Sequence, residues 1–196
     1  MKMKPWRVAV ASSLLFVAAC SYQTKPSVSP SYNVPSNYSE KIKGNYAVYV
    51  RSDEMKGEFS VTGYSCSAHS YPMDVRDQFE TSALKTVQQV VESAELIDEP
   101  LTDDALKKQN FAGMIKIEAR DLSVDLNVDT GFFSSDMKAE VRMVADLKAR
   151  TPGQKAIGTT MSAERDEKSD AEGACEGGAT AIGGATEDAM QALMRR

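Results

Sequence analysis

The residues best suited to covalent chemistry are Cys66, Cys175 and the only histidine, His69. Cys66 and His69 belong to one short run, Cys66-Ser67-Ala68-His69. A thiol beside an imidazole forms the nucleophile of thiol enzymes, and Cys-x-x-His spacing also occurs in metal sites. A zinc site needs three or four ligands, and the chain has no second Cys/His pair. A cysteine nucleophile needs a third group that orients the histidine, and the sequence does not identify one.

A second candidate site is the turn between Asp129 and Asp136, which contains the adjacent residues Phe132 and Phe133. Turns are usually polar, so two neighbouring phenylalanines are unusual there. One interpretation is that they fold back onto the sheet edge or a helix. The other is that they are exposed and bind a partner or a bilayer, because aromatic side chains dominate interface hot spots.

The N-terminus has the features of an export signal. Three basic residues, Lys2, Lys4 and Arg7, precede an apolar segment over residues 8–19, which is too short to span a bilayer as a helix. The run Val17-Ala18-Ala19-Cys20 follows and resembles the lipobox of bacterial lipoproteins. The resemblance implies cleavage before Cys20, a diacylglycerol on its sulfur and acylation of the new N-terminus. The alternative is an ordinary signal peptide with a chance cysteine.

The same resemblance implies a location. In lipoproteins of double-membrane bacteria, a residue other than aspartate after the lipidated cysteine directs the protein to the outer membrane, and Ser21 fits that rule. The expected location is therefore the outer membrane, with the domain facing the periplasm.

Export also changes the interpretation of the cysteines. Disulfides persist in oxidising compartments, so the simplest prediction is a bond between Cys66 and Cys175. Closing a loop of that length contributes about 4–5 kcal/mol in the chain-entropy model. Such a bond would leave no thiol for a Cys66–His69 enzyme or a metal site.

Composition divides the chain into three parts. Residues 1–19 are the predicted signal peptide, residues 20–43 a lipidated cysteine with a flexible tether rich in Ser, Pro and Tyr, and residues 44–196 one periplasmic domain. Removing the signal peptide takes away three positive charges, and the formal net charge falls from −5 to about −8. An acidic domain without a basic run is poorly suited to nucleic acid, so no nucleic-acid partner is expected.

Hydrophobic periodicity predicts the elements of the domain. Apolar residues three and four apart predict helices from about Val75 to Leu96 and from about Ala179 to Met194, and Thr102 is expected to cap a short helix to Lys108. Strands are expected over 45–51, 58–66, 111–119, 122–128, 139–147 and 156–163, and a charged loop over 164–172. The prediction is an α+β fold: an antiparallel sheet of four to five strands with two longer helices on one face. Glycines near the last helix are expected to allow tight packing.

A lipid anchor, a tether and a compact α+β domain resemble the small outer-membrane lipoproteins of envelope assembly and secretion, including LptE-like, YajG-like and transport-auxiliary lipoproteins. The resemblance implies a non-catalytic accessory or assembly subunit that binds an envelope protein or another copy of itself. The alternatives are a lipoprotein that binds glycolipid or cell-wall glycan and, second, a thiol enzyme using Cys66 and His69. The sequence has neither GxSxG nor HExxH, and no cofactor or metal is expected.

Overall fold

The computed structural model describes residues 22–31, 40–62, 66–130, 135–170 and 174–195. Within these ranges the chain forms an α+β fold with three α-helices and two sheets, which confirms the predicted fold class. Cys20, Phe132 and Phe133 lie outside the described residues.

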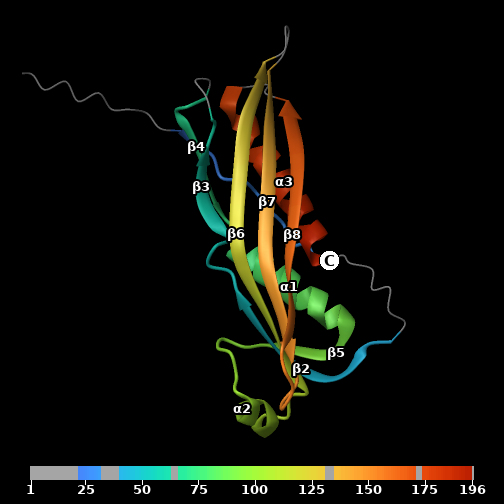
Figure 1. Ribbon diagram of the computed structural model, residues 1–196. Coiled ribbons are helices and arrows are strands. Elements are labelled where there is room, and N and C mark those ends of the chain that lie inside the picture. The colour runs from blue at the N-terminus through green and yellow to red at the C-terminus, as the bar shows by residue number, and fades with distance from the viewer. Residues whose placement is uncertain (1–21, 32–39, 63–65, 131–134, 171–173, 196) are drawn as a thin grey trace, which may run out of the picture.

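The larger sheet has five strands in the order β5, β2, β6, β7, β8 (Figure 1). Their bounds are Val91–Leu96 for β5, Ile42–Arg51 for β2, Gly113–Thr130 for β6, Ser135–Arg150 for β7 and Ile157–Asp170 for β8. The last three strands form an antiparallel meander, but β2 is parallel to both of its neighbours. The prediction of an antiparallel sheet is therefore wrong for β2. Alternation of side chains reveals the faces of a strand and not its direction, which here is set by helical crossovers.

The smaller sheet is also mixed, with the order β1 (Tyr22–Gln23), β4 (His69–Asp74), β3 (Lys56–Ser60). Strand β4 was not predicted, because Pro72 and Asp74 resemble a helix start. The proline is tolerated because β1 pairs only with His69 and Ser70, so β4 has no strand on that side at Pro72.

The helices are α1 (Arg76–Val90), α2 (Asp103–Lys108) and α3 (Gly177–Met194), and a 3₁₀ turn, Ala174–Glu176, precedes α3. The predicted first helix is too long: Val91 is extended and begins β5. Two consecutive β-branched residues, Val90 and Val91, fit this switch to a strand. Thr102 caps α2 as predicted, because its side chain accepts a hydrogen bond from Ala105 N at 3.3 Å. None of the described helices is long and apolar enough to cross a membrane.

The main core lies between the larger sheet and two helices. Helix α3 contacts β7 and β8, and α1 contacts β2 and β5; Figure 1 shows both helices behind the sheet. Alternate residues of β7 are fully buried on this inner face: Met137, Ala139, Val141, Met143 and Ala145. Of the residues between them, Glu140 and Arg142 are exposed on the opposite, outer face.

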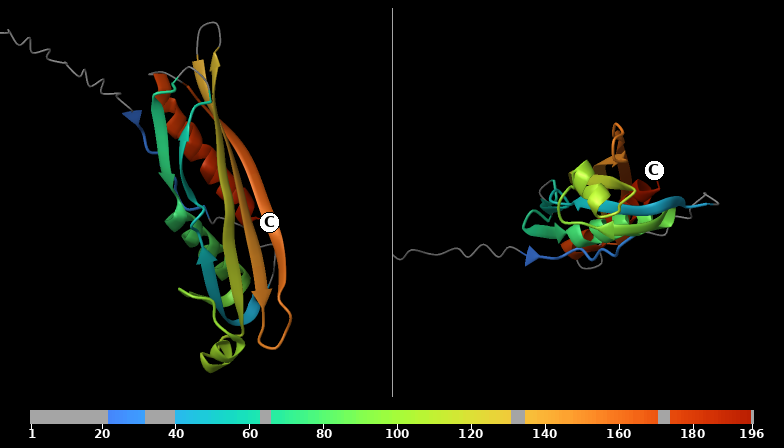
Figure 2. Two further views of the ribbon diagram at one scale, coloured as in Figure 1. Left: turned by 60° about the vertical axis from the view of Figure 1, so that its left-hand side comes forward. Right: turned by 90° about the horizontal axis from the view of Figure 1, so that it is seen from below.

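A second, smaller core lies on the outer face at one end of the sheet. Ala47 and Val48 are adjacent in β2 and point to opposite faces; Val48 belongs to the main core, whereas Ala47 packs with Leu106 of α2. The ion pair between Arg150 and Asp103, with 3.0 Å between Nη1 and Oδ1, ties α2 to β7. Figure 2 shows α2 at the end of the molecule that lies far from β1.

Two segments differ from the expected loops. A charged loop was expected over 164–172, but strand β8 continues through residues 164–170, because these residues pair with β7; for example, Glu164 lies opposite Arg142. Residues 22–31 belong to the expected flexible tether, but in the structure they lie along the domain and form hydrogen bonds to it.

Candidate functional site

The predicted disulfide is present in the structure. Cys66 is bonded to Cys175, and their Cα atoms are 5.4 Å apart. The buried hydroxyl of Tyr71 donates a hydrogen bond to the carbonyl of Cys175, and burial raises the pKa of this tyrosine. Gly178 lies against the same ring, where an added Cβ would be 2.6 Å from Tyr71 Cζ. The expected tight packing of a glycine near Cys175 is therefore confirmed at Gly178.

This bond changes the interpretation of Cys66 and His69. The sulfur of Cys66 is in the disulfide, so it provides no free thiol to pair with the imidazole. The His69 ring instead stacks on Tyr22, with 5.1 Å between the ring centroids. Among the residues that the structure describes, no group of three His, Cys, Asp or Glu side chains is arranged to bind a metal ion.

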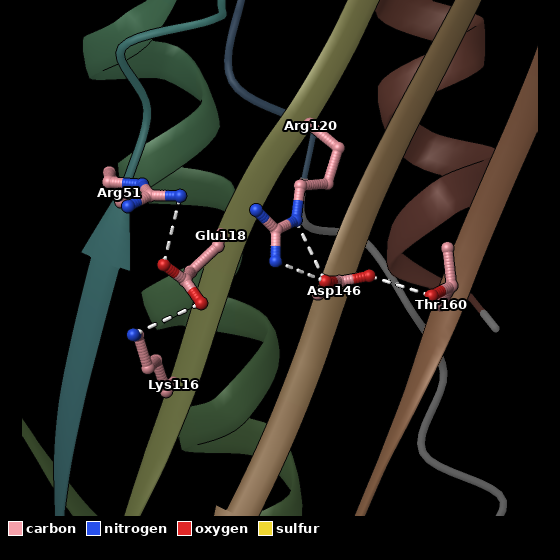
Figure 3. A network of polar contacts seen from close by, with 6 residues as sticks. All are labelled: Arg51, Lys116, Glu118, Arg120, Asp146 and Thr160. Atoms are coloured by element: carbon pink, nitrogen blue, oxygen red, sulfur yellow. Dashed lines mark hydrogen bonds and ion pairs between the residues drawn. The ribbon is translucent and has the colours of Figure 1, made fainter.

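The outer face of the larger sheet holds a polar network that the sequence did not reveal (Figure 3). Its centre is Glu118 of β6, which is only 4% exposed. Arg51 Nη2 lies 3.0 Å from one carboxylate oxygen of Glu118, and Lys116 Nζ lies 3.1 Å from the other. The parallel register places Arg51 directly opposite Glu118. Sequence alternation gave no sign of this pairing, because it does not specify which strands are neighbours.

The electrostatic balance at Glu118 favours the carboxylate. Burial raises its pKa, but the Lys116 hydrogen bond and the charges of Lys116, Arg51 and Arg120 outweigh burial, so the pKa lies below its usual value. A group with a lowered folded-state pKa stabilises the fold above its unfolded pKa, and this contribution is lost as the pH falls through the folded-state pKa.

A second carboxylate links three strands next to this centre. Asp146 of β7 accepts hydrogen bonds from Arg120 Nε on β6 and Thr160 Oγ1 on β8, each at 2.7 Å. The hydrogen bond from Thr160 has the largest effect on the pKa of Asp146 and the bond from Arg120 the next largest, and both hold it below its usual range. Arg120 lies where the register between β6 and β7 shifts between Ala119 and Asp121, and this bulge directs its guanidinium toward Asp146.

A shallow hollow lies beside Asp146 at the start of β8. Asp146, Lys148 and residues 156–160 line it. Ile157 is 74% exposed at its margin, and β8 is an edge strand, with β7 as its only neighbour in the sheet. The hollow therefore adjoins the exposed edge of the larger sheet, and no sequence pattern indicated it.

Comparisons with known proteins show structural likeness at low identity. A Xanthomonas campestris protein of the family DUF330 has 11% identity and a TM-score of 0.48, over 88% of this chain and 92% of that chain. A Helicobacter pylori homologue of the neuraminyllactose-binding hemagglutinin has 12% identity and a TM-score of 0.46, over 85% and 88%. No family model and no curated protein matches the chain. Likeness at this level transfers no function, so the resemblance to envelope-assembly lipoproteins stays a prediction.

The disulfide predicts a large redox effect on stability. The variant with Cys66→Ser and Cys175→Ser should have a free energy of unfolding about 3–5 kcal/mol lower than the wild type, because the bond closes a sequence separation of 109 residues. Urea denaturation measures the change. A reducing agent should lower the wild-type midpoint in the same direction and leave the serine variant unchanged; an equal midpoint for both proteins would contradict the prediction.

Glu118 predicts sensitivity to acid. Glu118→Gln should lower the free energy of unfolding by about 1–3 kcal/mol at neutral pH, because Arg51 and Lys116 lose their charged acceptor. The difference from wild type should shrink as the pH falls below 4.5, the ordinary pKa of this group. Urea titrations between pH 7 and pH 3 measure it. Glu140→Gln, at an exposed position of the same face, is the control and should change stability little.

Proposed function

We propose that this protein is a lipid-anchored, non-catalytic protein of the bacterial cell envelope that acts as an accessory or assembly subunit through protein–protein interaction. Support for the anchor comes from the basic N-terminal residues, the apolar segment and the run Val17-Ala18-Ala19-Cys20. Ser21 supports placement at the outer membrane. Stable anchoring needs at least two acyl chains, and the processed cysteine of a lipoprotein carries that number.

The observation that carries the interaction role is the open edge of β8 over Ile157–Ser162. This half of the strand contains no charged residue, whereas all five residues from Glu164 to Lys168 are charged. Natural proteins protect sheet edges with charges, bulges or short strands, so an uncharged open edge is typical of a strand that accepts a partner. The exposed side chain of Ile157 adds an apolar contact beside the hollow.

The partner that fits this edge is an extended segment of another envelope protein. Such a segment adds a strand through backbone hydrogen bonds, and its alternate side chains bind the adjoining hollow. Asp146 and Lys148 line the hollow with one charge of each sign, which favours a segment with polar side chains beside its apolar contact.

The test is crosslinking in intact cells, followed by affinity capture of the full-length lipoprotein and mass spectrometry. Replacing Ile157 and Thr159 with lysine should remove a defined set of captured envelope proteins, because two charges would then lie on the accepting edge. The thermal midpoint should stay close to that of the wild type, since both positions are exposed.

The matched control is Leu96→Lys, which places a charge at a 41% exposed residue of β5, the opposite edge strand. Capture should persist in this variant. Unchanged capture by the Ile157 and Thr159 variant would refute the edge as the binding site. Recovery of the protein alone, or of lipid and glycan, would refute the accessory role and favour self-association or glycan binding.

The Phe132 and Phe133 turn gives a separate prediction, since the strands on either side of it end far from the start of β8. Replacing both phenylalanines with serine should abolish partner capture without unfolding the domain if the turn binds a protein partner. Circular dichroism checks the fold, and the same capture experiment measures binding. Persistent capture would show that the turn does not bind the protein partner.

A further inference from the structure

The segment Tyr22–Ser31, called the N-terminal strap below, is bound to the domain along its length. Its first two residues form β1 and pair with His69 and Ser70 of β4. Tyr22 N donates to Ala68 O at 3.1 Å, and Thr24 N donates to Ser70 O at 3.2 Å. The Tyr22 ring stacks on His69. The start of the strap is therefore fixed by backbone and ring contacts together.

The second half of the strap lies against α1 and α3. Ser29 N donates to Glu187 Oε1 at 2.6 Å, and Ser31 N donates to Ser82 Oγ at 2.9 Å. Val28 packs against the main core. At Gly183 an added Cβ would be 2.6 Å from the carbonyl oxygen of Ser27, so the strap passes where only glycine leaves room.

The strap begins at one particular end of the molecule. Tyr22 lies opposite His69, next to the loop that contains Cys66. The disulfide joins this loop to the 3₁₀ turn that precedes α3. Figure 1 and the left view of Figure 2 show that the hairpin ends of β6 and β7 lie at the same end of the molecule as β1, whereas α2 lies at the other end. We call the first the hairpin end and the second the α2 end.

Cys20 is separated from Tyr22 by one residue. Consecutive Cα atoms are 3.8 Å apart, so the Cα atoms of Cys20 and Tyr22 are at most about 7 Å apart. A free tether of twenty residues would instead have a root-mean-square span of about 25 Å. With a bound strap, a lipid on Cys20 brings the hairpin end to the headgroups and removes the freedom that the tether composition suggests.

We propose that the hairpin end, with Tyr22 and residues 67–69 at its surface, rests on the lipid bilayer and that the α2 end points away from it. This proposal rests on the lipid anchor of the proposed function. Tyr22 is 59% exposed, and an aromatic ring with a polar tip suits the headgroup region. Strand β6 has 18 residues, a length of about 60 Å, so the α2 end extends deep into the surrounding compartment.

The short link between Cys20 and the strap, and not the charge of the surface, brings the hairpin end to the bilayer. The charged side chains described at the hairpin end include Glu176 and the pair Lys168–Asp129, with 3.6 Å between Nζ and Oδ2. They form no basic cluster that would attract anionic lipid. The orientation should therefore be insensitive to salt.

The test uses the full-length lipidated protein in vesicles of phosphatidylethanolamine and phosphatidylglycerol that carry a dansyl headgroup acceptor. Trp6, the only tryptophan, lies in the predicted signal peptide, so an introduced tryptophan is the sole donor in the mature protein. Ser67→Trp labels the hairpin end and Lys108→Trp the α2 end, both at exposed positions. We expect energy transfer from the Ser67→Trp protein to be several-fold stronger, at low and at high salt.

A matched pair of variants tests the strap. Gly183→Ala places a Cβ against the Ser27 backbone, whereas Gly184→Ala meets only the flexible Glu167 side chain, at 3.1 Å. Gly183→Ala should reduce the difference between the two donors and accelerate hydrogen exchange at the amides of Thr24, Ser29 and Ser31. Gly184→Ala should change neither measurement.

The outcomes separate the orientation from the anchor. Equal energy transfer at both positions in vesicle-bound protein would overturn the orientation and leave the anchor intact. Protein that does not float with vesicles, or a mature mass without lipid on Cys20, would overturn the anchor and the orientation with it.

Discussion

The close contact between α3 and the inner face of the β6–β7–β8 meander is the constraint on which the other features depend. The buried residues of α3 are mostly small, including Gly178, Ala181, Gly183, Ala185 and Ala189, so the helix backbone approaches the sheet and its neighbours closely. Tyr71 packs where Gly178 lacks a side chain, and the strap packs where Gly183 lacks one. The disulfide then ties the 3₁₀ turn that precedes this helix to the loop before β4. A larger helix surface would displace the strap and the smaller sheet together.

The long meander divides the molecule into a buried and a solvated face. On β7 the inner residues between Met137 and Ala145 are fully buried while Glu140 and Arg142 are exposed, so this part of the sheet needs a helix on one side only. Helix α2 covers the outer face at the far end of the sheet. Glu118 is the exception, a carboxylate buried on the outer face. It is tolerated because Arg51 and Lys116 contact both of its oxygens. The pairing also links β2 to β6, where the parallel and antiparallel parts of the sheet meet.

Most of the elements could be predicted from the sequence, because side-chain periodicity is a local property. The alternation in β7, the apolar face of α3 and the Thr102 cap all depend on residues near one another in the chain. The predictions that failed concern features that depend on distant residues: the direction of β2, the strand at Pro72 and the charged half of β8. The charged half of β8 is extended because β7 pairs with it. The cysteine pairing was predicted because only Cys66 and Cys175 remain once Cys20 is assigned to the predicted lipid anchor. The site around Glu118 and the edge position of β8 could not be predicted, because both depend on the order of the strands in the sheet.

The strap shows why composition alone does not separate a bound segment from a free one. Residues 22–31 are rich in serine and proline and show no hydrophobic periodicity, and both features are typical of a flexible tether. Their order comes from the surface that receives them: a hydroxyl at Ser82, a carboxylate at Glu187 and a missing side chain at Gly183. Because each partner lies more than fifty positions away in the chain, no local pattern records the match. The predicted lipid anchor at Cys20 is compatible with a domain that moves freely and with one that is oriented, and these distant contacts favour the oriented one.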